Sequence, residues 1–145
     1  MATLTITRGL PGSGKTTWAR QQVGAVRVNR DDLRRMLHGR HLGFPRAEAQ
    51  VTVAQRALVA ALLGHGLNVI CDDTNLSPSA VRELRRIAAQ AGAEVVMRDF
   101  TDVPIDICIA RDAARADGTR VGEEAIRAMH RRYLAKAATP AVPEN

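Results

Sequence analysis

The sequence predicts an α/β domain with about four parallel strands, helices on both faces of the sheet and a helical lid. Two observations carry this prediction. A glycine-rich loop joins the first strand candidate to the first helix candidate, a position typical of phosphate-binding loops. Strand and helix signals then alternate along the rest of the chain, which is the pattern of a parallel sheet flanked by helices.

The individual elements follow from apolar periodicity and from the positions of Gly and Pro. Strand candidates are short β-branched or apolar runs. The third is apolar except for Asn68, as buried parallel strands tend to be. Pro78 and Gly92 mark the start and the stop of one helix. The expected strands are 3–7, 25–28, 67–71 and 93–100, the expected helices are 15–23, 31–38, 48–63, 78–91, 105–116 and 123–137, and 39–45 is an expected loop.

Size and composition indicate one domain in a reducing compartment. The chain has 145 residues, 46% hydrophobic and 25% charged, with only two cysteines. Residues 1–138 are expected to form the catalytic domain, and residues 139–145 a disordered tail that contains two prolines. No apolar run approaches the ~20 residues of a membrane span. We therefore predict a cytoplasmic protein with no membrane partner, and a homo-oligomer is compatible with the sequence.

The charge balance has two interpretations. Lys and Arg number 21 against 15 Asp and Glu, a net charge of +6. A small domain this basic can be attracted to a polyanion such as nucleic acid. The alternative is solubility, or the Arg-rich composition that a GC-rich genome gives. Charge alone favours neither.

The loop from Gly9 to Thr16 reads Gly-Leu-Pro-Gly-Ser-Gly-Lys-Thr and matches every fixed position of the P-loop motif. Its glycines let successive N–H groups face one anion, and the following helix N-terminus adds partial positive charge. Lys15 is expected to reach the β- and γ-phosphates, and Thr16 to be a ligand of Mg²⁺. The motif predicts a P-loop NTPase fold with ATP as phosphate donor. The expected ATP ligands from this segment are Gly9, Pro11, Gly12, Ser13, Gly14, Lys15, Thr16 and Thr17.

A second cluster, Arg30-Asp31-Asp32-x-Arg34, follows the second strand candidate. Functional groups gather at the carboxyl ends of parallel strands, so Asp31 is expected near the phosphate loop. A carboxylate there can accept the proton of an attacking hydroxyl, and Arg34, three residues on, can pair with a phosphate of the acceptor. The alternative is an ordinary helix cap with solvated neighbours. The phosphate loop favours the catalytic interpretation.

A third cluster, Asp72-Asp73-Thr74-Asn75, ends the apolar third strand candidate. An acidic residue at this place resembles a Walker B carboxylate, which holds Mg²⁺ directly or through water. Asp72 or Asp73 could do this, or could brace Arg34. These residue types also favour turns, and both interpretations can hold at once because turns carry sites.

A fourth cluster contains Arg111, Arg115 and Arg120 around the break at Gly118. The first two are four residues apart and therefore share one helical face. Arginines on a closing lid can neutralise the charge that develops during phosphoryl transfer. The alternative is a solvated helix face with Asp112 as a local partner, and the sequence favours neither.

These four clusters, in this order, resemble the kinase domain of bacteriophage polynucleotide 5′-kinases. The resemblance covers roughly residues 2–134. The phosphate loop alone is unspecific, whereas the combination of the four clusters is fairly specific. The segments that carry it are Pro11-Gly12-Ser13-Gly14-Lys15-Thr16-Thr17-Trp18-Ala19-Arg20, Asn29-Arg30-Asp31-Asp32-x-Arg34, Asp73-Thr74-Asn75-Leu76-x-Pro78, and Asp102-Val103-Pro104 with Arg111 and Arg115.

The resemblance implies a role for each matching residue. Asp31 would be the general base that activates a 5′-hydroxyl. Arg34 would contact the phosphate on the 3′ side of the acceptor nucleotide. Asp73 would support Arg34 and the acceptor site, and Thr74 would be a further acceptor-binding residue. The catalytic residues implied are Lys15, Asp31, Arg34 and Arg115, with Arg111 and Arg115 reaching over the ATP phosphates and Thr16 binding the metal.

The sequence also departs from the family. The best-known members carry a 3′-phosphatase domain after the kinase, and no Asp-x-Asp-Gly-Thr motif occurs here, so we expect kinase activity without phosphatase activity. The lid reads Arg115-Ala116-Asp117-Gly118, where the family often has a glycine sooner after the arginine. A phage origin is compatible with the resemblance.

Three functions therefore compete. The leading hypothesis is a polynucleotide 5′-hydroxyl kinase acting on DNA or RNA ends. The second is a small-molecule P-loop kinase of the gluconate or antibiotic type, which shares the phosphate loop. The third is a nucleotide-dependent switch without transfer. Asp31 argues against the switch because a switch needs no base for a hydroxyl acceptor. Arg34 and the basic charge favour the polynucleotide.

Overall fold

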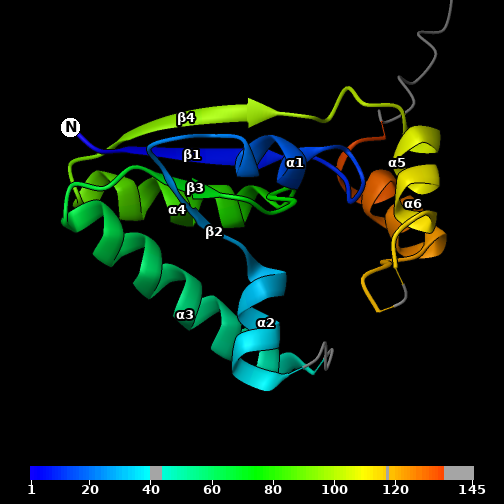
Figure 1. The fold of residues 1–145 in the computed structure, drawn as a ribbon, viewed down its shortest axis with the longest axis horizontal. Helices are drawn as coiled ribbons and strands as arrows, with labels where there is room; N and C mark the ends of the chain where they lie inside the picture. The colour runs from blue at the N-terminus through cyan, green and yellow to red at the C-terminus, as the bar shows by residue number, and fades with distance from the viewer. Residues whose placement is uncertain (40–43, 117, 136–145) are drawn as a thin grey trace, which may run out of the picture.

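The computed structural model describes residues 1–39, 44–116 and 118–135. The predicted alternation of strands and helices is confirmed, and Figure 1 shows all the elements. They are β1 (Thr3–Arg8), α1 (Lys15–Arg20), β2 (Val26–Val28), α2 (Arg30–His38), α3 (Pro45–Gly64), β3 (Val69–Cys71), α4 (Pro78–Gln90), β4 (Glu94–Asp99), α5 (Ile105–Ala113) and α6 (Glu123–Tyr133).

The strands form one parallel four-stranded sheet in the order β2-β3-β1-β4, which confirms the predicted fold class. In the register, Cys71 of β3 lies between Val28 of β2 and Ile6 of β1. The three carboxyl ends therefore meet at one edge. The segments that follow them are the phosphate loop, the start of α2 and the Asp72-Asp73 cluster, so the topology brings together the first three clusters of the sequence.

One face of the sheet carries the main hydrophobic core. Leu4 and Ile6 of β1 are fully buried there. Helices α3 and α4 pack on this face, and Val51 and Val59 of α3 are also fully buried. Aliphatic side chains from the strands and from the helices thus interdigitate, which gives the close packing that such a layer needs.

Helix α1 flanks the opposite face. Val95 and Met97 of β4 pack against the main core, so Arg98, which lies between Met97 and Asp99 in β4, points the other way. Its guanidinium carbon lies 5.3 Å from the ring centre of Trp18 in α1. Helices therefore lie on both faces of the sheet, as predicted.

Helices α5 and α6 form a separate unit beyond the carboxyl ends of the strands (Figure 1). They have a small core of their own, in which Cys108 of α5 and Ile126 of α6 are fully buried. Leu10 of the phosphate loop belongs to the same core. This unit is therefore attached to the loop and occupies the place expected of a lid.

Several element ends differ from the predictions. Helix α1 ends at Arg20, before the expected residue 23, because the N–H groups of Gln21 and Gln22 turn back to residues three positions earlier. Helix α3 begins at Pro45, inside the expected loop, because proline suits the first turn of a helix. Helices α5 and α6 end at Ala113 and Tyr133, earlier than expected.

Two predictions concern the ends and the surroundings of the chain. The predicted tail, residues 139–145, lies outside the described residues, as do residues 40–43 of the predicted loop. Across the described ranges, no helix combines the length and the apolar character that a membrane span requires.

Candidate active site

The phosphate loop and the lid enclose a cavity of about 470 Å³. The loop contributes backbone and side chains from Gly12 to Thr17, and the end of the lid helix contributes Arg111 and Arg115. The predicted donor-site residues are thus largely brought together. The complete lining is Gly12, Gly14, Lys15, Thr16, Thr17, Trp18, Gln21, Arg111 and Arg115.

Lys15 is held inside the loop. Its Nζ donates to the carbonyl oxygen of Leu10 at 2.7 Å and to Ser13 Oγ at 3.3 Å. Burial lowers the pKa of Lys15 to about 8, although the charge of Asp72 opposes that shift. Burial disfavours the positive charge of Lys15, and a bound phosphate would stabilise that charge. The site is therefore suited to an anion.

Asp72 and Thr16 form the best place for a divalent cation. Thr16 Oγ1 donates to Asp72 Oδ2 at 2.9 Å. The side chain of Asp72 is 0% exposed, and its Oδ1 atom is buried without a hydrogen-bond partner. An orphaned carboxylate oxygen beside a P-loop hydroxyl suits Mg²⁺, which prefers a few protein oxygens with phosphate and water.

Thr16 and Asp72 are not part of a larger cluster of metal-binding side chains among the described residues. Within residues 1–39, 44–116 and 118–135, no three His, Cys, Asp or Glu side chains gather into a group that could hold a metal ion.

The lid arginines have different partners. Arg111 Nη1 donates to the Gly12 carbonyl oxygen at 3.4 Å, so it reaches the phosphate loop directly. Arg115 Nη1 lies 3.5 Å from Asp112 Oδ1. Asp112 also accepts hydrogen bonds from the N–H groups of Val121 and Gly122, both at 2.9 Å, and so joins α5 to the start of α6.

Helix α2 carries the predicted acceptor residues. Asp31 is 61% exposed and is paired with Arg34, as their spacing predicts. Glu48 of α3 holds the same guanidinium in a bidentate contact, at 2.6 Å from Nε and 2.8 Å from Nη2. Hydrogen bonding to Arg34 lowers the pKa of Glu48 to about 2. Arg34 is therefore fixed between two carboxylates: each of its three guanidinium nitrogens donates to one of them, and its side chain is 17% exposed.

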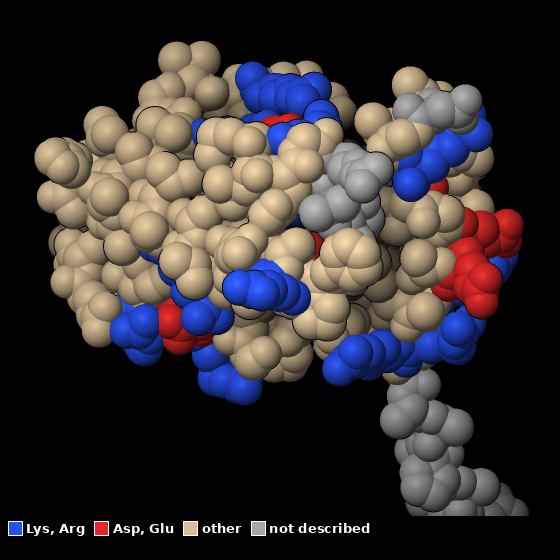
Figure 2. All heavy atoms as spheres, turned by 90° about the horizontal axis from the view of Figure 1, so that it is seen from below, with Lys and Arg blue, Asp and Glu red and all other residues tan. Residues whose placement is uncertain are grey.

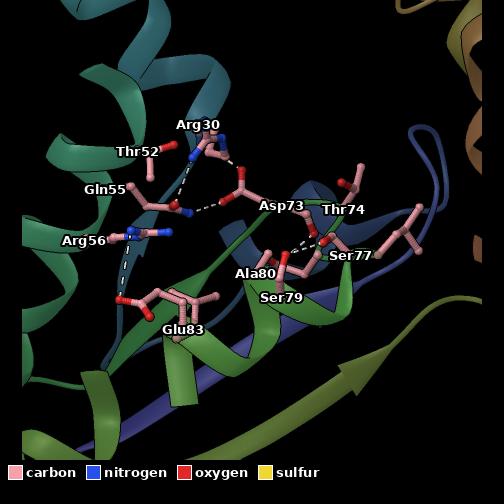
Figure 3. A pocket seen from close by; sticks show the side chains of 13 residues that line it. Arg30, Thr52, Gln55, Arg56, Asp73, Thr74, Ser77, Ser79, Ala80 and Glu83 are labelled. Atoms are coloured by element: carbon pink, nitrogen blue, oxygen red, sulfur yellow. Dashed lines mark hydrogen bonds and ion pairs between the residues drawn. The ribbon is translucent and has the colours of Figure 1, made fainter. Parts of the chain in front are cut away.

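Asp73 lies in a second cavity, of about 520 Å³, between α3 and α4 (Figure 3). Its carboxylate accepts from the Arg30 N–H and from Gln55 Nε2, both at 2.8 Å. The predicted direct contact between Asp73 and Arg34 is therefore replaced by the contact between Glu48 and Arg34. Asp73 instead positions the first turn of α2. Thr74 lines the same cavity, with the hydroxyl groups of Thr52, Ser77 and Ser79 and the guanidinium groups of Arg30 and Arg56.

The environment of Asp73 predicts a pH effect on stability. Burial raises the pKa of Asp73 from 3.8 to about 7. Between these values the folded protein holds a proton that the unfolded chain has lost, so this group favours the folded state less as pH rises. The free energy of unfolding of the natural protein, relative to the Asp73→Asn variant, should fall by roughly 2–3 kcal/mol from pH 5 to pH 8.

Urea unfolding of both proteins at the two pH values measures this difference. Asp106→Asn, at an exposed carboxylate of α5, is the control and should leave the pH profile unchanged. Parallel profiles for the natural protein and Asp73→Asn would show that Asp73 is ionised in the folded protein throughout this range.

Four site residues were not predicted from the sequence: Arg27, Glu48, Gln55 and Asp112, the last considered only as a solvated partner. Gln55 had a detectable signal. It is buried in α3 four residues from both Val51 and Val59, and a polar residue in an apolar stripe indicates a specific partner. The other three have no local signal because their partners lie in other elements or past a turn.

On one face of the molecule, the basic side chains do not form a single patch. Figure 2 shows one face on which Lys and Arg side chains lie in several separate groups with acidic residues between them. This distribution supports solubility as well as attraction to a polyanion, so the site geometry carries more weight than the net charge.

Comparison with known proteins identifies related sequences. A family model described as an AAA domain matches residues 4–139. A putative bifunctional polynucleotide kinase/RNA ligase of Autographa californica nuclear polyhedrosis virus is 28% identical over 141 residues, covering 87% of this chain and 20% of that protein. An adenylyl-sulfate kinase of Myxococcus xanthus is 34% identical over 112 residues, covering 72% of this chain and 60% of that protein.

Solved structures agree on the fold. A chain of the Pnkp1/Rnl/Hen1 RNA repair complex matches with a TM-score of 0.79 and 33% identity, over 91% of this chain and 44% of that one. The Mycobacterium tuberculosis APS kinase CysC, in complex with AMPPNP and APS, matches with a TM-score of 0.61 and 20% identity, over 78% and 69%. These matches confirm the P-loop kinase fold and the resemblance to polynucleotide kinases. The chain spans less than two thirds of either curated relative.

Proposed function

The chain belongs to the AAA domain family, and from that premise we propose that it is an ATP-dependent kinase acting on the 5′-hydroxyl ends of DNA or RNA. The observation that carries the proposal is the Asp31–Arg34 pair on α2. Asn29, which caps this helix, donates from Nδ2 to the carbonyl oxygen of Asp72 at 2.6 Å. A proton acceptor and a phosphate-binding group thus lie on a helix anchored beside the candidate metal ligand.

The donor half would bind ATP through the phosphate loop. Lys15 and the loop N–H groups would hold the β- and γ-phosphates, with Arg111 and Arg115 approaching from the lid. Thr16 and Asp72 would hold Mg²⁺, which supplies neutralising charge to the phosphates when bound. Because charge spreads over the equatorial oxygens during transfer, fixed cations on two sides lower the barrier.

The acceptor half would supply the base. Asp31 takes the proton of the 5′-hydroxyl as that oxygen attacks the γ-phosphorus. The new oxygen–phosphorus bond forms as the bond from the γ-phosphorus to the bridging oxygen breaks, and ADP leaves. Arg34 orients Asp31, and the second N–H of its Nη1 and Nη2 groups would hold the phosphate on the 3′ side of the acceptor nucleotide. Sugars lack such a phosphate.

The cavity at Asp73 and Thr74 offers room for the acceptor strand. Its lining combines hydroxyl groups with the guanidinium groups of Arg30 and Arg56, groups that bind sugar and phosphate oxygens without reading base sequence. Figure 3 shows Thr74 on the side of this cavity nearest the phosphate loop. The viral relative, named as a polynucleotide kinase/RNA ligase, supports the same acceptor class.

A small-molecule kinase is the second candidate. The specific observation in its favour is the adenylyl-sulfate kinase relative, whose identity of 34% exceeds that of the viral relative. Such an acceptor also presents a hydroxyl and a nearby anion, so Asp31 and Arg34 would keep their chemical roles.

Transfer of label from γ-labelled ATP separates the candidates. The protein and Mg²⁺ are incubated in separate reactions with a 5′-hydroxyl oligonucleotide, the same oligonucleotide already carrying a 5′-phosphate, adenylyl sulfate, a nucleoside or a sugar, and Lys15→Met serves as the inactive control. We expect label on the first acceptor alone. Label on adenylyl sulfate, a nucleoside or a sugar, with none on the 5′-hydroxyl oligonucleotide, would overturn the proposal. Release of a 3′-phosphate from a labelled oligonucleotide would overturn the expected lack of phosphatase activity.

A further inference from the structure

Arg27 of β2 connects the two halves of the site. Its Nε donates to Asp72 Oδ2 at 2.7 Å, and its Nη1 donates to Asp32 Oδ2 at 2.6 Å. The arginine side chain is only 20% exposed. One guanidinium group therefore bridges the carboxylate at the candidate metal position and a carboxylate on the helix that bears Asp31.

We propose that Arg27 is a positioning residue that holds α2 against the donor site and competes with the divalent cation for Asp72. This inference rests on the proposed function for its kinetic part, whereas its metal-binding part does not require the acceptor to be a polynucleotide.

The competition follows from the contacts of Asp72. Oδ2 already accepts from Thr16 and from Arg27, while Oδ1 has no partner. A divalent cation at this carboxylate would lie within a few ångströms of the guanidinium, and like charges at that distance in a buried place repel strongly. The positive charge of Arg27 therefore opposes binding of the cation at Asp72, even though Oδ1 is the oxygen that remains without a partner.

The positioning follows from the other end of the bridge. Asp32 is the residue next to Asp31, and its own N–H donates to Asn29 Oδ1 at 2.9 Å in the cap of α2. Burial opposes the charge of Arg27, but hydrogen bonds with Asp72 and Asp32 outweigh it and raise its pKa. The bridge is thus a charged, partly desolvated contact, which is the kind that fixes geometry.

The substitution Arg27→Met tests both parts because it keeps most of the chain length and removes the charge and the donors. Mn²⁺ binding to the protein without nucleotide is followed by electron paramagnetic resonance, and kcat is measured with the 5′-hydroxyl oligonucleotide. We expect the Mn²⁺ Kd to fall on the order of tenfold. We expect kcat to fall as well, by about tenfold, because Asp31 loses its fixed position.

Two further variants separate charge from geometry. Arg27→Lys keeps the charge without the planar fork that joins two carboxylates, so it should restore the natural Mn²⁺ affinity and leave kcat low. Arg35→Met removes an exposed arginine, 3.7 Å from Asp32, and should change neither quantity. Circular dichroism of each variant checks that the fold is intact.

The outcomes distinguish the inference from the proposed function. An unchanged or weaker Mn²⁺ affinity in folded Arg27→Met overturns the competition. An unchanged kcat overturns the positioning role. If the natural protein labels no oligonucleotide while Arg27→Met binds Mn²⁺ more tightly, the proposed function is wrong and the competition is supported.

Discussion

The Asp31→Asn variant should lose phosphoryl transfer while its affinity for ATP stays nearly unchanged. An amide has the same shape as the carboxylate but cannot accept the hydroxyl proton, and general bases contribute roughly 10²–10⁴-fold to rate. ATP binding should be unaffected because Asp31 is largely exposed and does not line the cavity of the phosphate loop. Arg34 keeps its bidentate contact with Glu48, so the helix should hold its position.

Initial rates with a 5′-hydroxyl oligonucleotide and the Kd for ATP measure the two effects separately. Asp106→Asn, which neutralises an exposed carboxylate on α5, should keep both values. Full activity in Asp31→Asn would show that another group accepts the proton. A parallel loss of ATP affinity would place Asp31 in the donor half instead.

Much of the fold could be predicted because its signals are local. The phosphate loop is a contiguous motif, and the strand of residues 69–71 is a contiguous apolar run that is buried throughout. Glycine and proline positions marked the ends of α4 within about one residue, closer than the usual uncertainty of such boundaries. Parallel topology then required the carboxyl ends of β1, β2 and β3 to meet, which placed the first three clusters together.

The buried face of α3 could be predicted only in part, because Val51, Ala54 and Leu62 lie at the core as expected whereas Leu58 and Ala61 are exposed. The sequence alone predicts an amphipathic helix over residues 48–63 whose apolar face consists of Val51, Ala54, Leu58, Ala61 and Leu62. The structure buries Ala47, Val51, Gln55, Val59 and Leu63, a stripe with four-residue spacing, and leaves Leu58 38% exposed. Several apolar residues on α3 allow more than one stripe, and contact with the sheet and α4 decides between them.

The partners of charged residues also depend on tertiary packing. Asp73 was expected to support Arg34. In the structure Glu48 binds the Arg34 guanidinium instead, because α3 packs against α2 at this point. Asp73 instead accepts hydrogen bonds from the Gln55 side chain and from the backbone N–H of Arg30 at the start of α2. Residues 14 or 18 positions apart in sequence meet only after the helices pack, so no spacing rule could pair them.

The second large effect is expected at Gly12, where the phosphate loop touches the lid. Gly12 has a φ of +81°, and a Cβ atom there would lie 2.3 Å from the carbonyl oxygen of Cys108 in the middle of α5. That oxygen is helix backbone, so it cannot move aside alone. Gly12→Ala must therefore separate the loop from the lid or deform both.

Two costs add in this variant. A left-handed conformation costs a residue with a Cβ roughly 1–2 kcal/mol, and overpacking costs about 1–3 kcal/mol more. We expect the free energy of unfolding to fall by about 3 kcal/mol. ATP affinity should fall at least about tenfold, because Arg111, which donates to the Gly12 carbonyl oxygen, would move with α5.

Gly24→Ala isolates the first cost. Gly24 has a φ of +82°, almost the same as Gly12, and a Cβ there would meet nothing within 4 Å. Urea unfolding should show a loss of only about 1 kcal/mol for Gly24→Ala, with ATP affinity unchanged. Equal losses in the two variants would mean that the lid yields to the added methyl group without cost. A larger loss at Gly12, accompanied by weaker ATP binding, would establish that contact between the loop and α5 holds the donor site in shape.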